Sequence, residues 1–194
     1  MSNTATIRRQ GPVVLADLIS DSLLKDTALV VGAAGLVGLM AQVSIHLAFT
    51  PVPITGQTLA VLLCGTALGF RRGAAALGLY ALAGLLGVPW FAGHAAGYVG
   101  ASFGYIVGFV LAAAVCGLLA ERRADRSILR SIPAMAAGEV VMYAVGVAWL
   151  AVDLHVGAGK AISLGLTPFL AGDAIKAALA AVALPSAWKL AGRK

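Results

Sequence analysis

Charged side chains are scarce in this sequence: only 11% of its 194 residues are Asp, Glu, Lys or Arg. Soluble domains carry about 25%, so the shortage excludes an ordinary soluble protein. Hydrophobic residues make up 60% of the chain instead. We therefore expect an all-α, polytopic membrane protein, and the length suits a single domain.

Cysteine is also rare, and the two that occur are Cys64 and Cys116. Both stand in apolar segments, and their spacing fits neither a metal site nor a disulfide framework. We expect two free thiols in the core, where unpaired cysteine is usually found.

The common nucleotide-binding motifs are missing. The segment Gly157-Ala-Gly-Lys160 resembles the end of a phosphate-binding loop, but Leu154 and Ala161 stand where that loop requires Gly and Ser or Thr. The closely spaced glycines at 97–104 follow no predicted strand, so they are not a dinucleotide fingerprint. The sequence predicts no ATP site, and energy for uphill movement would have to come from another protein.

Catalytic and metal-binding patterns are missing as well. His46, His94 and His155 lie near predicted helix ends and lack metal-ligand spacing. No arrangement of nucleophile, base and orienting acid is recognisable. Glu139 lies within an apolar segment, where we expect it to make a structural hydrogen bond. The sequence therefore predicts neither an enzyme nor a resident cofactor or metal.

What the chain does contain is a series of six apolar segments. A helix needs about 20 residues to cross a bilayer, and the second segment is shorter than this. Counting it as a crossing puts Arg71 and Arg72 on the same side as Lys25, which favours six transmembrane helices. Their predicted ranges are about 27–48, 57–70, 73–91, 98–120, 132–152 and 162–188.

This topology collects nearly all basic residues on one side, which the positive-inside rule identifies as the cytoplasm. The exceptions are Lys160 in an outer loop and Lys176 inside the last segment. The net charge of +6 is thereby explained without a nucleic-acid partner. We expect a bacterial cytoplasmic membrane protein with both termini inside. The basic residues on that side are Arg8, Arg9, Lys25, Arg71, Arg72, Arg122, Arg123, Arg126, Arg130, Lys189, Arg193 and Lys194.

The expected organisation has three parts: a cytoplasmic N-terminal segment at 1–26, one six-helix transmembrane domain at 27–190, and a cytoplasmic tail at 191–194. Within the first part, the pattern at 13–24 predicts a short amphipathic helix on the membrane surface. The charged loop at 121–130 is expected to be a solvated turn that could also contact a partner.

The most informative residues are Asp173 and Lys176, which stand in the last apolar segment. Their i, i+3 spacing puts both on one helix face. Each costs roughly 2.5–3.5 kcal/mol at the centre of a bilayer. The pair therefore indicates a polar ligand, an ion path or an internal ion pair within the bundle.

Two further features frame this pair. The segment Pro51-Val-Pro-Ile-Thr-Gly-Gln-Thr58 follows the first helix, and Thr55 and Gln57 could form a polar lid over a pocket or belong to an ordinary capped turn. In the first helix, Ala34 and Gly38 form a small-xxx-small pair. This pair could pack within the chain or dock a second membrane subunit.

Five motifs occur in a characteristic order: Pro-Val-Pro-Ile-Thr-x-Gln-Thr-Leu-Ala-Val-Leu-Leu, Arg-Arg-Gly, Gly-Val-Pro-x-Phe-Ala-Gly, Gly-x-x-x-Gly-Tyr-Ile-Val-Gly-Phe and Gly-Asp-x-x-Lys. They begin at residues 51, 71, 87, 100 and 172. Together, over about 25–190, they resemble the BioY family, the biotin-binding S components of energy-coupling-factor (ECF) transporters. One departure is Gly100-Ala-Ser102, where the family commonly has Gly-Pro-Thr, which removes a proline from a local bend.

The resemblance implies an S-component-like bundle of six helices that binds biotin from outside, beneath the loop between the first two helices. It implies that Asp173 and Lys176 bind the ligand. It also implies that the region around Ala34 and Gly38 docks a transmembrane coupling protein (T component), which in turn sits on paired ATP-binding-cassette ATPases.

The chemistry of the residues agrees with such a ligand. Asp173 can accept the ureido N–H groups of biotin, and Lys176 can donate to the ureido oxygen or to the carboxylate. Tyr80, Phe91 and Phe103 are candidates to cover the bicyclic ring. Transport of this kind needs no covalent chemistry by the chain.

Three alternatives remain open at this point. The chain could be an S component for another small vitamin. It could be an intramembrane enzyme that uses Asp173 with Glu139 or a histidine. It could also be a membrane scaffold in which Asp173 and Lys176 form an internal ion pair.

Overall fold

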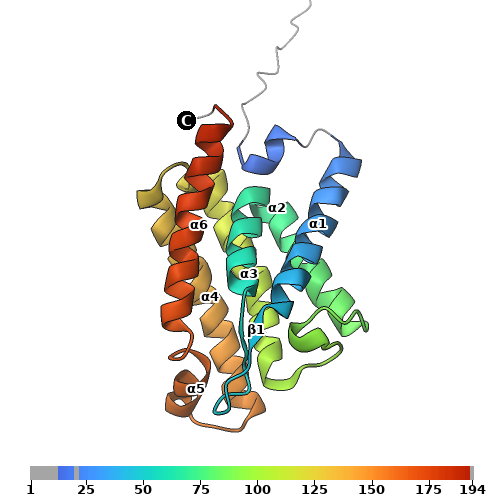
Figure 1. Cartoon of the computed structure of the whole chain (residues 1–194), viewed down its shortest axis with the longest axis vertical. Helices are drawn as coiled ribbons and strands as arrows, with labels where there is room; N and C mark the ends of the chain where they lie inside the picture. Colours follow the sequence, from blue (N-terminus) through green and yellow to red (C-terminus); the bar gives the residue numbers. More distant parts are fainter. Residues whose placement is uncertain (1–12, 20–21, 193–194) are drawn as a thin grey trace, which may run out of the picture.

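The computed structural model describes residues 13–19 and 22–192. Long helices run side by side along the molecule and form a bundle (Figure 1). The C-terminus and the 3-10 turn η1 (Leu15–Leu18) lie at one end, here called the basic end. The helix α5 (Ala158–Gly165) and the strands β1 (Ser44–Ile45) and β2 (Ile54–Thr55) lie at the other, the pocket end.

Five helices of the described chain are long and apolar enough to cross a membrane. The α-helices are α1 (Leu23–Gln42), α2 (Gln57–Leu85), α3 (Phe103–Glu121), α4 (Ile128–Asp153) and α6 (Leu170–Leu190), with α5 as a sixth, short one. Short 3-10 turns are η2 (Ala92–His94), η3 (Gly100–Ser102) and η4 (Ala124–Arg126). The predicted all-α membrane fold is confirmed.

Helix α2 contains the second and third predicted crossings, because the chain reverses inside it. Gly69 has φ 83° and ψ 178°, a conformation that only glycine adopts readily. The Gln57 side chain donates to the Tyr80 hydroxyl at 2.7 Å, whereas 23 residues of continuous helix would separate them by about 35 Å. The two arms are therefore antiparallel, and Arg71 and Arg72 stand at the turn.

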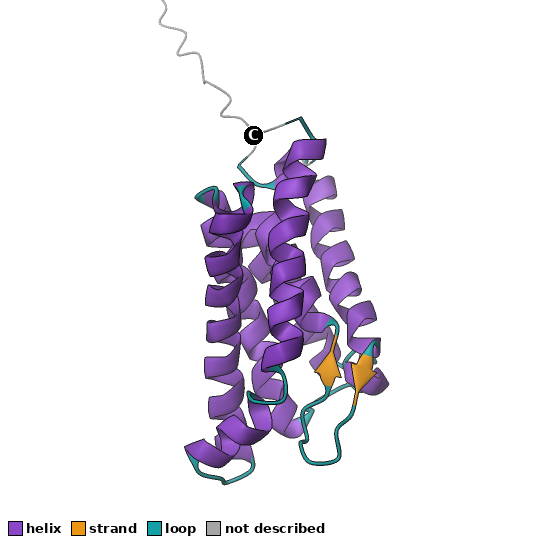
Figure 2. Ribbon diagram, turned by 60° about the vertical axis from the view of Figure 1, so that its left-hand side comes forward, coloured by secondary structure: helices purple, strands orange, loops and turns teal. Residues whose placement is uncertain are grey.

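Several predicted boundaries were wrong, among them the ends of 73–91 and 98–120, which became Leu85 and Phe103, and three further differences have clear local reasons. Helix α1 starts at Leu23 rather than 27, because Ser22 caps it by accepting a hydrogen bond from the Lys25 N–H. It ends at Gln42, where the antiparallel pair of β1 and β2 begins (Figure 2). The last predicted segment is divided into α5 and α6, because Pro168 lacks a backbone donor and disfavours helix before it.

The centre of the bundle is the contact between α2 and α3, where glycines let backbones approach closely. A Cβ on Gly117 would lie 2.4 Å from the Gly69 carbonyl carbon and 2.5 Å from the Phe70 nitrogen. Cys64 and Cys116 are free and buried in this region, as predicted. Close packing of small residues therefore sets the distance between the two helices.

Gly117→Ala is expected to destabilise the protein by at least about 1–3 kcal/mol, because the new methyl group must displace backbone rather than a flexible side chain. Gly35→Ala is the matched control, since a Cβ at Gly35 meets nothing within 4 Å. The control should be neutral or stabilising by up to about 1 kcal/mol. Thermal unfolding of both variants in detergent tests this; equal melting temperatures would contradict the close α2–α3 contact.

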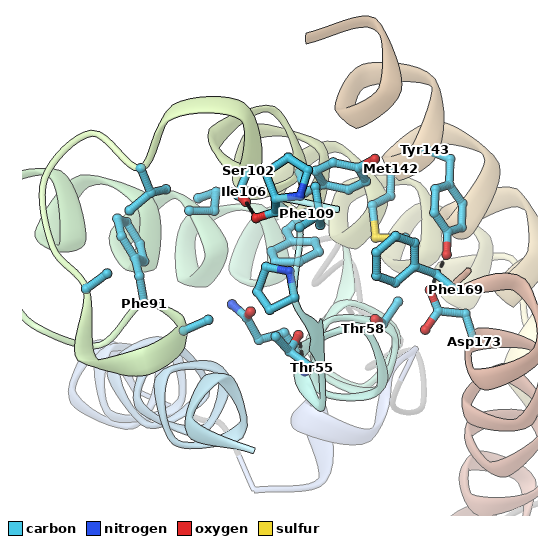
Figure 3. A pocket seen from close by; sticks show the side chains of 18 of the residues that line it. Thr55, Thr58, Phe91, Ser102, Ile106, Phe109, Met142, Tyr143, Phe169 and Asp173 are labelled. Carbon is cyan, nitrogen blue, oxygen red and sulfur yellow. Dashed lines mark hydrogen bonds between the residues drawn. The ribbon is translucent and has the colours of Figure 1, made fainter. Parts of the chain in front are cut away.

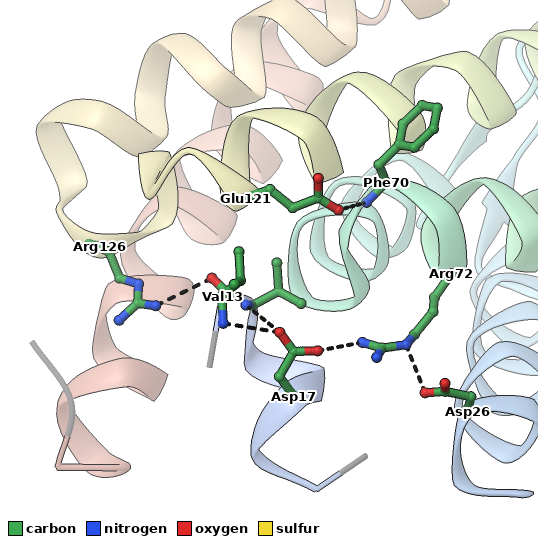
Figure 4. A network of polar contacts seen from close by, with 8 residues as sticks. Val13, Asp17, Asp26, Phe70, Arg72, Glu121 and Arg126 are labelled. Atoms are coloured by element: carbon green, nitrogen blue, oxygen red, sulfur yellow. Dashed lines mark hydrogen bonds and ion pairs between the residues drawn. The ribbon is translucent and has the colours of Figure 1, made fainter. Parts of the chain in front are cut away.

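The basic end is fastened by η1 (Figure 4). Arg72 donates to Asp17 at 2.8 Å and pairs with Asp26 at 2.7 Å, and Arg126 donates to the Val13 carbonyl at 3.3 Å. Of the predicted amphipathic helix at 13–24, the described residues form a single 3-10 turn, η1, and the start of α1. Arg8, Arg9, Arg193 and Lys194, which the predicted topology places nearby, lie outside the described residues.

The loop at 121–130 is less solvated than expected. Asp125 is fully buried and accepts a hydrogen bond from the Trp188 indole N–H. The Arg126 guanidinium lies 3.4 Å from the centroid of the Trp188 ring. Burial raises the pKa of Asp125, which is consistent with a carboxyl group enclosed between η4 and the end of α6.

Asp17 is expected to make a pH-dependent contribution to the stability of the fold. Partial burial acts to raise its pKa, but hydrogen bonds from Arg72 and from the Val14 and Val13 N–H groups outweigh it, so the pKa is lowered from 3.8. A lowered carboxyl pKa stabilises the fold above 3.8, and this contribution is lost as the pH falls below that value.

Asp17→Asn should therefore cost at most about 1 kcal/mol at pH 7, because the pair is partly exposed to solvent. The gap between wild type and variant should close as the pH falls below 3.8. Melting temperatures measured from pH 7 to 3 test this. A gap that stays constant over that range would show that the charge on Asp17 does not matter.

Candidate functional site

A pocket opens at the pocket end, between the α1–α2 loop and the helices α2, α3, α4 and α6. Its empty space amounts to about 820 Å³ when the open mouth is included. Most of its lining is apolar. The lining residues are His46, Pro51, Val52, Pro53, Thr55, Gln57, Thr58, Tyr80, Phe91, Ala92, Ala95, Val99, Ser102, Tyr105, Ile106, Phe109, Met142, Tyr143, Phe169, Asp173 and Lys176.

Asp173 and Lys176 form the charged side of this pocket. They lie in the first turns of α6, and the Lys176 Nζ is 2.7 Å from the Asp173 Oδ1. Asp173 is 4% exposed, and its other oxygen accepts a hydrogen bond from the Tyr143 hydroxyl. The first turn of a helix also favours a negative charge. The two residues are thus paired with each other and still face a cavity.

Lys176 also joins α6 to the α1–α2 loop. Its Nζ donates to the Thr55 carbonyl at 2.6 Å and lies 3.5 Å from the Thr58 hydroxyl. The Thr55 hydroxyl accepts from the Gln57 N–H at 3.3 Å and so helps to start α2. The Lys176 ammonium group therefore contacts both the buried carboxylate of Asp173 and the backbone of the α1–α2 loop.

The opposite side of the pocket is aromatic, and Figure 3 shows Phe91 there, across from Asp173 and Tyr143. The Phe91 and Tyr80 rings meet edge-on with centroids 5.3 Å apart, and Trp90 lies against the same tyrosine at 5.2 Å. Both Tyr80 and Phe91 are almost fully buried. We call the three rings Tyr80, Trp90 and Phe91 the aromatic wall.

Phe103, which the sequence offered as a candidate to cover the ring, lies away from the other candidates. It does not line the pocket, and its ring packs against Tyr98 and Trp149 at 5.7 and 5.6 Å. Phe103 is the first residue of α3, and the helix turns its side chain away while Ser102, Tyr105 and Ile106 face the cavity.

Several pocket residues were not predicted from the sequence. Tyr143 is the most important, because it bonds Asp173 directly. Its hydroxyl in an otherwise apolar segment was the available signal, since a buried tyrosine usually finds a partner for its O–H. Tyr105 donates to the Gly165 carbonyl at 2.7 Å and meets Tyr143 edge-on. Phe109, Met142 and Phe169 line the cavity without any distinguishing sequence pattern.

Glu139 lies one helical turn from Tyr143 on α4, but it does not line the pocket. We expected a structural hydrogen bond there. Its Oε1 atom is instead buried without a hydrogen-bond partner among the described residues. Among the histidines, only His46 reaches the pocket, at its mouth.

The small residues of α1 pack within the chain. Ala34 and Gly38 are both buried, and a Cβ on Gly38 would lie 3.1 Å from the Trp90 Cβ. Gly38 therefore packs against this protein's own loop, which corresponds to the packing alternative. The exposed side of the same helix includes Gly32 and Gly35, where an added Cβ would meet nothing within 4 Å among the described residues.

These features define a polytopic membrane protein with a largely apolar cavity between its helices near one end of the bundle. The chain belongs to the BioY family, whose model matches residues 9–193. Biotin transporter BioY of Rhizobium etli is 36% identical over 166 residues, which cover 80% of this chain and 87% of that protein. Biotin transporter BioY of Thermotoga maritima is 40% identical, with 68% and 78% covered.

The fold is similar to that of a solved relative. The crystal structure of the S-component for biotin from an ECF-type ABC transporter superposes with a TM-score of 0.79, covering 88% of this chain and 95% of that one. The sequences are 22% identical. A probable biotin transporter BioY of Pyrococcus horikoshii is 35% identical over 161 residues, which cover 81% of this chain and 93% of that protein.

Proposed function

We propose that this chain captures biotin at the pocket end and delivers it inward as the substrate-binding subunit of an ECF transporter. The observation that carries the proposal is the buried pair of Asp173 and Lys176 beside an aromatic cavity, in a chain of the BioY family. Biotin is the molecule named for the family's relatives.

Biotin matches the two sides of this cavity. Its fused ring carries two ureido N–H donors and one carbonyl acceptor, and its apolar chain ends in a carboxylate. Asp173 offers acceptor oxygens, and Lys176 offers a charged donor. Charge-assisted hydrogen bonds of this kind are about twice as strong as neutral ones. The aromatic wall supplies the apolar surface for the ring system or the chain.

The proposed direction of transport follows from the distribution of charge. Lys25, Arg71, Arg72 and the arginines of the α3–α4 loop lie at the basic end, which the positive-inside rule places in the cytoplasm. The pocket then opens outward, and both termini are cytoplasmic. The chain performs no covalent chemistry on biotin and carries no ATP-binding motif.

Energy for uptake is proposed to come from two partners: a transmembrane coupling protein and a pair of ATP-binding-cassette ATPases. The fold shared with the S-component of an ECF-type transporter supports this assignment. The exposed side of α1 around Gly32 and Gly35 is the helix surface that remains open for the coupling protein, because Ala34 and Gly38 are buried.

Ligand-induced stabilisation of the purified chain tests the proposal. Biotin at about 100 times its dissociation constant should stabilise the protein by about 2.7 kcal/mol. Thiamine, riboflavin and pantothenate at the same concentration serve as controls and should leave the melting temperature unchanged. No shift with biotin, or an equal shift with another vitamin, would contradict the proposal.

A further inference from the structure

The side chain of Gln42, the last residue of α1, holds the loop that carries Trp90 and Phe91 of the aromatic wall. Its Nε2 donates to the Trp90 and Phe91 carbonyls, both at 3.1 Å, and to the Gly38 carbonyl at 3.0 Å. Its Oε1 accepts from the His94 N–H at 3.1 Å. The amide therefore bonds to the backbone of Trp90, Phe91 and His94 in that loop, and it does not itself line the pocket.

Apart from these hydrogen bonds, the loop meets α1 through the packing of Trp90 against Gly38. Gly87 precedes Trp90 and Gly93 follows Phe91, with φ 108° and 68°, conformations that favour glycine. Between them, backbone bonds are local, such as Trp90 N–H to the Val88 carbonyl at 2.9 Å. The contacts of Gln42 reach across about 50 positions in sequence and join this loop to a different helix.

The loop segment that Gln42 holds is connected to the residues that line the cavity. The Trp90 indole donates to the Tyr80 carbonyl at 2.9 Å, and the Tyr80 hydroxyl accepts from Gln57 at 2.7 Å. Tyr80, Phe91 and Gln57 all line the pocket, whereas Gln42 does not. A shift of the 90–91 backbone would therefore move the rings that form one side of the cavity.

We infer that Gln42 is a positioning residue of the biotin site: its amide fixes the aromatic wall in the arrangement that accepts the ligand and thereby sets the affinity. The inference rests on the proposed function. Its chemistry is specific, because the NH2 group must be a donor toward the two loop carbonyls while the oxygen accepts from His94.

Two variants separate hydrogen bonding from space filling. Gln42→Glu keeps the size and the acceptor for the His94 N–H, but it turns an oxygen toward the Trp90 and Phe91 carbonyls. Gln42→Met keeps the length and removes the hydrogen bonds. We expect the dissociation constant for biotin to rise about tenfold in Gln42→Glu and less in Gln42→Met. Leu39→Ala, on the exposed face of α1, is the control that should bind as wild type.

The measurements are the biotin dissociation constant by titration and the melting temperature of each protein without ligand. A positioning role raises the dissociation constant of folded Gln42→Glu above that of Gln42→Met. A merely structural role lowers the melting temperature and leaves the affinity of the folded fraction unchanged, which would overturn the inference. If Gln42→Glu does not purify folded, unchanged affinity in Gln42→Met overturns it instead.

These outcomes are distinct from failure of the proposed function. If wild-type protein does not bind biotin at all, the proposed function is wrong. If wild type and Leu39→Ala bind biotin, and both Gln42 variants bind it with the wild-type dissociation constant, the ligand assignment stands and the proposed role of Gln42 is wrong.

Discussion

Asp173→Asn is expected to weaken biotin binding by at least about a hundredfold, or about 2.7 kcal/mol. The carboxylate lies beside the cavity at 4% exposure and is already oriented by Tyr143 and Lys176. Asparagine keeps the shape but loses the charge, and its NH2 group opposes a ligand donor or Lys176. A hydrogen bond to a charged group contributes about 1.5–3 kcal/mol to binding or stability. The cost is larger when the loss of that bond leaves a buried partner without a hydrogen bond.

The measurement is a biotin titration of purified Asp173→Asn, with Asp153→Asn as the matched control. Asp153 is also a carboxylate at the pocket end, but it accepts from the Tyr98 hydroxyl and does not line the cavity. The control should bind as wild type does. Wild-type affinity in Asp173→Asn would remove Asp173 from the site.

Lys176→Met is expected to reduce biotin affinity by a similar factor and also to destabilise the protein without ligand. Methionine has nearly the length of the lysine stem but cannot donate to the Thr55 carbonyl or to Asp173. Removing one member of a buried ion pair leaves the other uncompensated, at a cost of about 3–5 kcal/mol. The loop that Lys176 ties to α6 loses its charged contact at the same time.

The double variant Asp173→Asn, Lys176→Met distinguishes a ligand site from a structural ion pair. Because both charges are then removed, no unpaired charge is left buried, and the melting temperature should recover toward the wild-type value. Biotin affinity should not recover, because both ligand contacts are gone. A double variant that binds biotin like wild type would show that the pair only stabilises the bundle, as the scaffold alternative requires.

Much of the membrane topology could be predicted from the sequence, because hydrophobicity and the position of basic residues act over whole segments. Arg71 and Arg72 indicated that the chain returns between two crossings, and the reversal at Gly69 agrees. The ends of the helices depend on single residues. Ser22 as a cap and Pro168 as a breaker moved α1 and divided the last segment.

The candidate site was partly predictable for the same reason. Asp173 and Lys176 are conspicuous because charge is costly in a bilayer, and the polar residues of the α1–α2 loop stand out beside them. Which aromatic rings line a cavity depends on how each helix is rotated, and apolar sequence does not specify that rotation. Phe103 therefore looked equivalent to Phe91, although only Phe91 lines the pocket. Tyr143 belongs to α4 and meets Asp173 only in the folded bundle.

The most direct test of the account is a structure of this protein determined with bound biotin. The account predicts the ligand in the pocket between Asp173 and the aromatic wall, with polar atoms of biotin within hydrogen-bond distance of both Asp173 and Lys176. Biotin bound elsewhere on the chain, or in the pocket while the two charged groups contact only each other, would contradict it.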